Sequence, residues 1–157
     1  MSDIMNFSFI VYGVPVPQGS MRAFVPKGWK RAVITSANSK TKPWRQEVAG
    51  ACLNRLNGST PAGRSIPVRI GIDFFFDRPK SVKKLADKVT KPDIDKLARS
   101  ILDALTGIAF EDDCQVTDLH VTKQFGSPAR AEIVISEALP PQIPLLHAPI
   151  KNKDIPF

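Results

Sequence analysis

The clearest helical period in this sequence lies in the stretch Ile94-Asp95-Lys96-Leu97-Ala98-Arg99-Ser100-Ile101-Leu102-Asp103-Ala104-Leu105. Its apolar residues recur at i, i+3, i+4, i+7, i+8 and i+11, the spacing of a helix with one buried face. Gly107 follows as a helix terminator. The stretch therefore predicts an amphipathic helix that must pack its apolar face against another element.

The sequence on both sides of this helix predicts the partners that it needs. Residues 68–76 alternate between apolar and other side chains, which is typical of a strand with one buried face. Residues 6–14 predict a strand that ends at Pro15, and residues 18–42 a long loop. Pro43 suits the first turn of a second helix that ends at Asn57-Gly58. Residues 78–91, with five lysines, predict a solvated loop or a short helical turn.

The C-terminal part predicts a terminal strand pair, 116–125 and 131–135, around Gly126-Ser127-Pro128. The element order β-α-β-α-β-β indicates an α+β fold, a small mixed sheet of about four strands with two main helices. We predict one domain over residues 1–138 and a proline-rich tail over 139–157.

Composition limits the class of protein. The chain has 157 residues, of which 43% are hydrophobic, enough for one folded domain. The two cysteines, Cys52 and Cys114, lack metal-ligand or disulfide-framework spacing, which favours an intracellular protein. The sequence has neither an export leader nor a long apolar run, so we expect a soluble, cytoplasmic protein with no membrane partner.

Charge is divided unevenly along the chain. The net charge is +7, and residues 4–46 alone contain seven basic and no acidic residues. Residues 93–118 instead contain seven acidic residues and two basic ones. The basic segment indicates a polyanionic partner such as nucleic acid. The acidic cluster needs a separate explanation, because carboxylates repel phosphates.

The acidic cluster consists of Asp93 and Asp95 at the start of the predicted helix and Asp112 and Asp113 after it. If Asp93 is extended at the N-cap after Pro92, its carboxylate and that of Asp95 can face one volume. Asp112 and Asp113 join them only if the chain doubles back, with the next strand paired beside the start of the helix. Such a group of carboxylates implies a cation, and Mg²⁺, or Mn²⁺ in its place, suits oxygen ligands.

A structural alternative explains the same residues without a metal. Asp93 caps the helix, Asp95 and Asp103 pair with Arg99 at i+4 spacing, and Asp112-Asp113 make a turn. Spacing by itself slightly favours this alternative over a metal site. The basic segment elsewhere in the chain makes the two interpretations more nearly equal.

Residues 91–107, followed by Asp112-Asp113-Cys114-Gln115-Val116, resemble the RusA family of Holliday junction resolvases, common in phages and prophages. The early segment 13–20 also looks like the family's N-terminal segment. The resemblance, which covers roughly residues 7–135, implies a homodimeric, Mg²⁺-dependent endonuclease that cuts four-way DNA junctions symmetrically in recombination and repair. It implies a bacterial host cell as the location.

The resemblance implies catalytic roles for Asp93, Asp95 and Asp113, with Asp112 as a helper at the metal. Arg99 falls where the family carries a functional lysine, so it can clamp phosphate but cannot donate a proton. We predict that DNA contacts come from these residues: Gln18, Arg22, Lys27, Lys30, Arg31, Lys40, Lys42, Arg45 and Lys96.

Aromatic residues are further candidates for the DNA surface or the dimer interface. Trp29 is a candidate for base stacking. Alternation predicts that Phe74 and Phe76 lie in the core, whereas Phe75 points to the other face and is a candidate for the dimer interface. His120 and His147 are interpreted as structural residues and Cys52 as a packed helix residue.

Two other functions stay open from the sequence. One is a non-enzymatic DNA-binding protein, in which the acidic residues are only caps and surface pairs. The other is a metal nuclease that acts on other branched DNA, such as flaps or forks.

Overall fold

The computed structural model describes residues 6–19, 21–36, 38–84 and 86–139. One mixed sheet has the strand order β1-β6-β4-β5. Strand β6 pairs antiparallel with both β1 and β4, whereas β4 and β5 are parallel. The strands are β1 (Asn6–Tyr12), β4 (Val68–Phe76), β5 (Val116–Phe125) and β6 (Arg130–Glu137).

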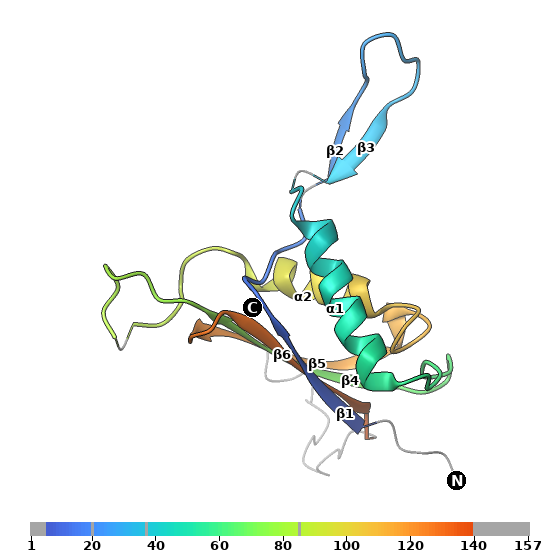
Figure 1. The fold of residues 1–157 in the computed structure, drawn as a ribbon. Coiled ribbons are helices and arrows are strands. Elements are labelled where there is room, and N and C mark those ends of the chain that lie inside the picture. The colour runs from blue at the N-terminus through green and yellow to red at the C-terminus, as the bar shows by residue number, and fades with distance from the viewer. Residues whose placement is uncertain (1–5, 20, 37, 85, 140–157) are drawn as a thin grey trace, which may run out of the picture.

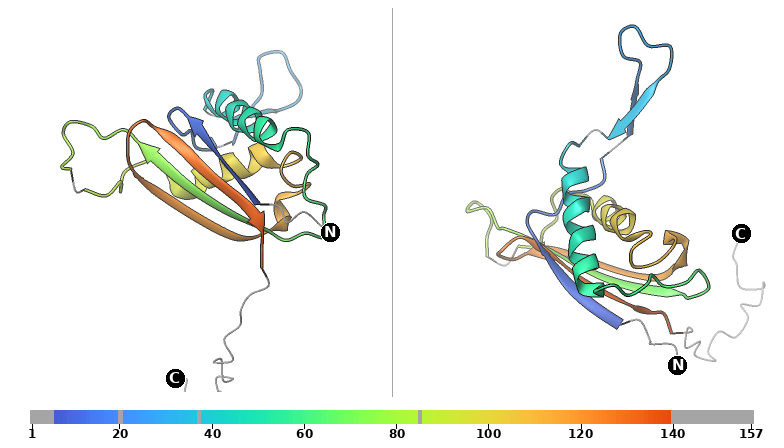
Figure 2. Two further views of the ribbon diagram at one scale, coloured as in Figure 1. Left: turned by 60° about the horizontal axis from the view of Figure 1, so that its bottom comes forward. Right: turned by 45° about the vertical axis from the view of Figure 1, so that its right-hand side comes forward.

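Two helices, α1 (Thr41–Leu56) and α2 (Ile94–Leu105), cover one face of this sheet (Figure 2). The core forms between the two helices and the sheet. Every second residue of β4 from Val68 to Phe74 is at most 1% exposed. Leu97, Ile101 and Leu105 of α2 are fully buried against it. A Leu97→Ala substitution removes about 2–5 kcal/mol of stability at such a position. The predicted α+β fold with four sheet strands and two helices is confirmed.

The segment predicted as a loop contains a hairpin instead. Strands β2 (Met21–Phe24) and β3 (Val33–Ser36) pair antiparallel and project from the body as an arm (Figure 1). The prediction of a loop over residues 18–42 was wrong for these two strands, because a hairpin that packs on no core needs no apolar alternation. We call residues 21–36 the basic arm.

The predicted pairing of the last two strands with each other was also wrong. Strand β5 lies on one side of β4 and β6 on the other, so the turn between them crosses the end of β4. The Gly126 N–H donates a hydrogen bond to the Phe76 carbonyl at this crossing (2.9 Å). A Cβ on Gly126 would come within 2.6 Å of the Phe75 ring, so only glycine fits there without rearrangement.

Strands β4 and β5 with α2 between them form a β-α-β unit. In such a unit the crossover helix runs antiparallel to both strands. The start of α2 therefore lies at the carboxyl ends of β4 and β5, and the end of α2 lies at their beginnings (Figure 1). A short 3₁₀ helix, η1 (Asp113–Gln115), precedes β5 at the second of these ends.

Individual side chains agree with several predictions. Phe74, Phe76 and Cys52 are buried, as predicted. Phe75 lies on the face opposite the helices, and the Arg130 guanidinium lies 3.8 Å from the centre of its ring. His120 is exposed on β5, and His147 lies outside the described residues. Within the described ranges, no helix is long and apolar enough to cross a membrane.

Candidate functional site

The start of α2 lies where the carboxyl ends of two parallel strands meet, which is where α/β units place ligand sites. Asp93 is the N-cap and is extended, with φ −70° and ψ 136°, which meets the condition for its carboxylate and that of Asp95 to face one volume. The Lys123 ammonium at the end of β5 donates hydrogen bonds to the carbonyls of Thr90 and Pro92, each with a donor–acceptor distance of 2.9 Å. These bonds hold the segment before Asp93 against the sheet.

The Asp93 carboxylate does not cap the helix. Its side chain accepts no capping hydrogen bond, and its Oδ2 atom lies 3.3 Å from Nζ of Lys96. Both side chains are 47% exposed. Asp95 follows in the first turn and is exposed. The structural alternative in which Asp93 acts as a side-chain cap is therefore wrong.

The ion pairs that the structural alternative gives to Arg99, with Asp95 and Asp103, also fail to form among the residues that the structure describes. Asp103 pairs with Arg45 of α1, with 3.5 Å between Nη1 and Oδ2, instead of with Arg99. Arg99 is exposed and, within the described part of the chain, is in no ion pair. Arg45, predicted to contact DNA, also donates to the Asp103 carbonyl (3.2 Å) and so joins the two helices.

Lys88 is a buried residue that also holds the segment before Asp93. It is only 9% exposed, and its ammonium donates to the carbonyls of Thr90 and Lys91 and to the Thr90 hydroxyl. The ammonium also lies 4.8 Å from the centre of the Phe76 ring. Burial, and then the charge of Lys123, lower the pKa of Lys88. The prediction that residues 78–91 are simply solvated was wrong for this lysine.

Asp112 and Asp113 lie at the other end of α2. Asp112 caps η1, where its side chain accepts a hydrogen bond from the Cys114 N–H (3.0 Å). This bond lowers the pKa of Asp112, and the carboxylate in turn raises the pKa of the Cys114 thiol. Asp113 is exposed.

Gln115 fixes this end of the molecule. Its Oε1 accepts hydrogen bonds from the N–H groups of Glu111 and Asp112, at 2.9 and 3.0 Å. Its Nε2 lies 2.8 to 3.3 Å from the carbonyl oxygens of Ala62, Gly63 and Ile66. One buried amide therefore joins η1 to the segment that enters β4.

The two carboxylate pairs are separated by the length of α2, about 18 Å for its 12 residues. Strand β5 begins beside Val68, and only the end of β5 lies near the start of α2. The condition under which Asp112 and Asp113 would join Asp93 within one chain is therefore not met. Within the described residues no group of three or more His, Cys, Asp or Glu could hold a metal ion. One chain therefore brings Asp93 and Asp95 to one end of the helix without Asp112 and Asp113.

A cavity of about 620 Å³ opens beside Asp93. Residues 14–19 and 91–93 line it, together with Asn38, Lys40, Phe76, Lys88 and Lys96. The Gln18 N–H donates a hydrogen bond of 2.8 Å to the Lys96 carbonyl, which connects the segment before the basic arm to α2. The predicted residues Gln18, Lys40 and Lys96 thus meet at this cavity.

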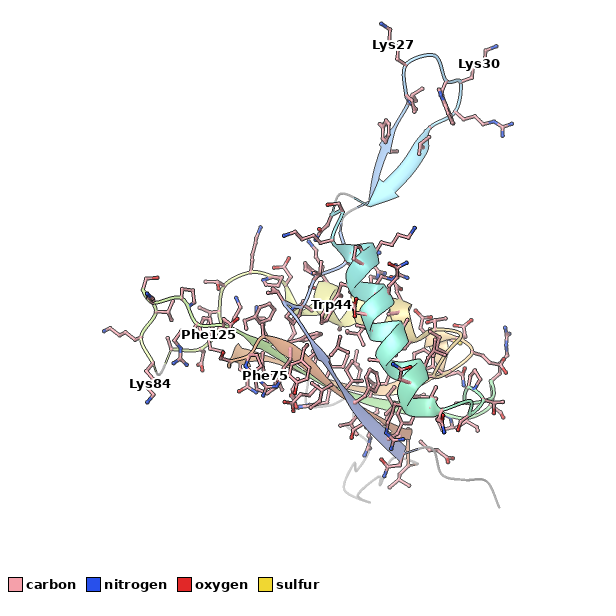
Figure 3. The ribbon with its side chains drawn as sticks, in the orientation of Figure 1. Lys27, Lys30, Trp44, Phe75, Lys84 and Phe125 are labelled. Atoms are coloured by element: carbon pink, nitrogen blue, oxygen red, sulfur yellow. The ribbon has the colours of Figure 1, made fainter. Side chains whose placement is uncertain are left out.

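The basic arm carries its charge away from the body. Figure 3 shows Lys27 and Lys30 at its tip, and Arg31 and Trp29 next to them are exposed. Lys42 is exposed in the first turn of α1. The side chain of Arg22 lies outside the described part. Exposed cations therefore lie both at the tip of the arm and in the first turn of α1.

Comparison with known proteins identifies the family. Residues 13–136 match the family described as Endodeoxyribonuclease RusA. The chain belongs to the RusA family. It is also similar to a Bacillus subtilis (strain 168) protein named "Uncharacterized protein YqaN". The two are 33% identical over 140 residues, which cover 82% of this chain and 94% of that protein. The predicted RusA resemblance is confirmed.

The match to RusA includes the basic arm, the start of α2 and η1. Membership of RusA indicates an endodeoxyribonuclease that acts on branched DNA. Sequence reasoning missed Lys88 and Lys123 as supports of this site. Lys88 belongs to a lysine-rich segment, and Lys123 to a strand, so neither local pattern distinguishes them from surface lysines.

Proposed function

We propose that this RusA-family chain is a divalent-metal-dependent endonuclease that resolves four-way DNA junctions by paired symmetric nicks. One juxtaposition carries the proposal. Asp93 and Asp95 lie at the start of α2, beside a cavity lined by lysines and at the base of an arm with exposed cations. Cations can hold the DNA backbone near carboxylates that would otherwise repel it.

Asp93 and Asp95 fit the needs of Mg²⁺, which usually takes one or two carboxylates and completes its shell with water and substrate phosphate. Among the described residues, Asp112 and Asp113 lie at the far end of α2 and form no metal-binding group with Asp93 and Asp95 within one chain. When bound, the metal would activate water and stabilise the leaving oxygen. Lys96 and Arg99, exposed on the first turns of α2, would hold the phosphate, and Arg99 would do so without giving up a proton.

Asp113 can act with Asp93 only from a second copy of the chain, because α2 separates them within one chain. A homodimer also suits a junction with two-fold symmetry, in which two sites cut paired strands. The face of the sheet opposite the two helices carries three exposed apolar side chains among the described residues, Ile10, Tyr12 and Val134, which a second copy would cover. We propose that the partner's Asp113 completes each site.

The test uses a labelled four-way junction with and without Mg²⁺. Wild-type protein should make paired symmetric nicks only with the metal. Asp93→Asn and Asp95→Asn should cut at least ~100-fold more slowly and still bind the junction in EDTA. Binding without cutting by the wild type would leave a non-enzymatic DNA-binding protein. Cutting of flaps or forks in preference to junctions would indicate a different branched substrate.

Mixing two inactive variants tests the shared site. In a mixed dimer of Asp93→Asn and Asp113→Asn chains, one site would combine both intact residues and regain nicking of one strand. Mixing Asp93→Asn with Asp95→Asn is the matched control, because each of the two shared sites in that mixed dimer still lacks one carboxylate. Equal inactivity of both mixtures would contradict the shared site and leave the metal proposal to the first experiment.

A further inference from the structure

The cavity beside Asp93 has one apolar wall. The wall consists of four consecutive residues of the segment before the basic arm: Val14, Pro15, Val16 and Pro17. Phe76 also lines the cavity. Pro15 and Pro17 have no backbone N–H, so this stretch offers few donors to water or to a polar ligand. Val14 is 63% exposed although it is apolar. Such a wall suits a flat apolar group.

The wall is held in place by the body of the protein. The Thr41 hydroxyl at the start of α1 donates to the Pro17 carbonyl (3.1 Å), and the Gln18 N–H donates to the Lys96 carbonyl. Lys88 and Lys123 hold residues 90–92, of which Lys91 and Pro92 line the cavity, through the carbonyl contacts described above. The cavity is therefore formed before any ligand arrives, which lowers the entropic cost of binding.

Gln18 supplies a polar group without a partner. Its Oε1 atom is shielded from solvent and, among the described residues, accepts no hydrogen bond. An unsatisfied buried acceptor costs about 1–3 kcal/mol. A rotation of the Gln18 side chain into the cavity would let this oxygen accept from an N–H group of a ligand and would remove that cost. The hydrogen-bonding edge of a nucleobase carries such groups.

The rim of the cavity is cationic. Lys40, Lys88, Lys91 and Lys96 line it, against one acidic residue, Asp93. The Lys88 ammonium is already held by carbonyl oxygens, whereas Lys40, Lys91 and Lys96 are exposed. An anion is therefore favoured next to the apolar wall. The arm of a second copy is disfavoured there, because it would bring Lys27, Lys30 and Arg31 against these lysines.

We propose that this cavity receives one unpaired nucleotide of the DNA, with its base on the 14–17 wall and its phosphate among Lys40, Lys91 and Lys96. The inference rests on the proposed action on branched DNA and adds a way to position the strand. Unstacking a base costs a few kcal/mol, and least where the base is already unpaired. The phosphodiester next to the captured base would then lie beside Asp93.

The test places 2-aminopurine at successive positions around the branch point of a four-way junction and measures its fluorescence in EDTA, where no cutting is needed. Wild-type protein should raise the fluorescence at one position as the base leaves the stack. Gln18→Leu should weaken binding of that junction roughly three- to ten-fold, the worth of one hydrogen bond. Gln46→Leu, at an exposed position of α1 outside the cavity, is the matched control and should change nothing.

A second variant blocks the cavity. Val14→Trp should abolish the fluorescence rise, while the arm still supplies most of the affinity. Saturated binding of the wild type with no rise at any position would overturn the proposal, and so would an unchanged rise in Val14→Trp. If Val14→Trp instead changes the mass of the assembly in solution and leaves the fluorescence rise, the cavity holds a second copy. Failure of the proposed nuclease function can be distinguished from failure of this inference, because it is seen as absence of junction cutting in Mg²⁺, whereas the fluorescence is measured in EDTA.

Discussion

Lys96 Nζ lies 3.3 Å from Asp93 Oδ2, one turn along α2, and both side chains are half-exposed. The carboxylate at the start of the helix is therefore paired with a cation, and its exposure leaves it open to a metal that would compete with the lysine. The same lysine lines the cavity. This pair connects the candidate metal ligand with the candidate DNA surface.

Replacing Lys96 should affect metal and DNA in opposite directions. In Lys96→Gln, Asp93 loses a competing cation, so the Mg²⁺ concentration for half-maximal cutting should fall, by up to about five-fold for an exposed pair. Junction binding in EDTA should weaken, because a phosphate contact is lost. Mg²⁺ titrations of cutting and anisotropy titrations of binding measure the two effects. A rise in the Mg²⁺ requirement would contradict the assignment.

The basic arm should control the salt dependence of DNA binding. Each phosphate contact lowers the slope of log K against log salt by about 0.9. The double variant Lys30→Ala, Arg31→Ala should therefore make the slope shallower by about two, and fluorescence anisotropy at several KCl concentrations measures it. Arg55→Ala, in the last turn of α1 away from the arm, is the control. An unchanged slope in the double variant would remove the arm from the DNA surface.

Gln115 should be important for stability. Gln115→Met leaves several backbone groups of residues 62–66 and 111–112 without partners, so we expect about 3 kcal/mol less free energy of unfolding in urea. Gln46→Met, at an exposed position of α1, should change it by less than about 0.5 kcal/mol. A similar small change for Gln115→Met would show that water replaces these hydrogen bonds.

The two cysteines should react at very different rates. Burial raises the pKa of Cys52 to about 11, so iodoacetamide should not modify it in the folded protein at pH 8. Cys114 is exposed, and the Asp112 carboxylate raises the pKa of its thiol. Asp112→Asn should lower that pKa and increase the thiolate fraction, which speeds alkylation at pH 8. Mass spectrometry follows both sites.

Asp87→Asn provides the matched control for the alkylation experiment, since it removes the same charge from an exposed loop position. It should leave the rate at Cys114 unchanged. Equal rates in wild type and Asp112→Asn would show that the carboxylate does not act on the thiol.

Local patterns predicted much of the fold. The apolar period of residues 94–105 and the alternation of residues 68–76 correspond to α2 and β4, because each element buries one face and so repeats with its own period. The place of Asp93 at a candidate N-cap after Pro92 also permitted the extended backbone that the structure shows. The hairpin of the basic arm escaped prediction, because it buries no face that would impose a period.

The sequence by itself determined the helices, the central strands, the RusA resemblance and the concentration of positive charge before Glu47. Only the tertiary structure decided that β5 runs parallel to β4, which puts Asp113 at the opposite end of α2 from Asp93. It also decided the burial of Lys88 and the cavity with Gln18 at its edge. Strand partners and cavities depend on contacts between residues far apart in the chain, and local periodicity carries no record of them.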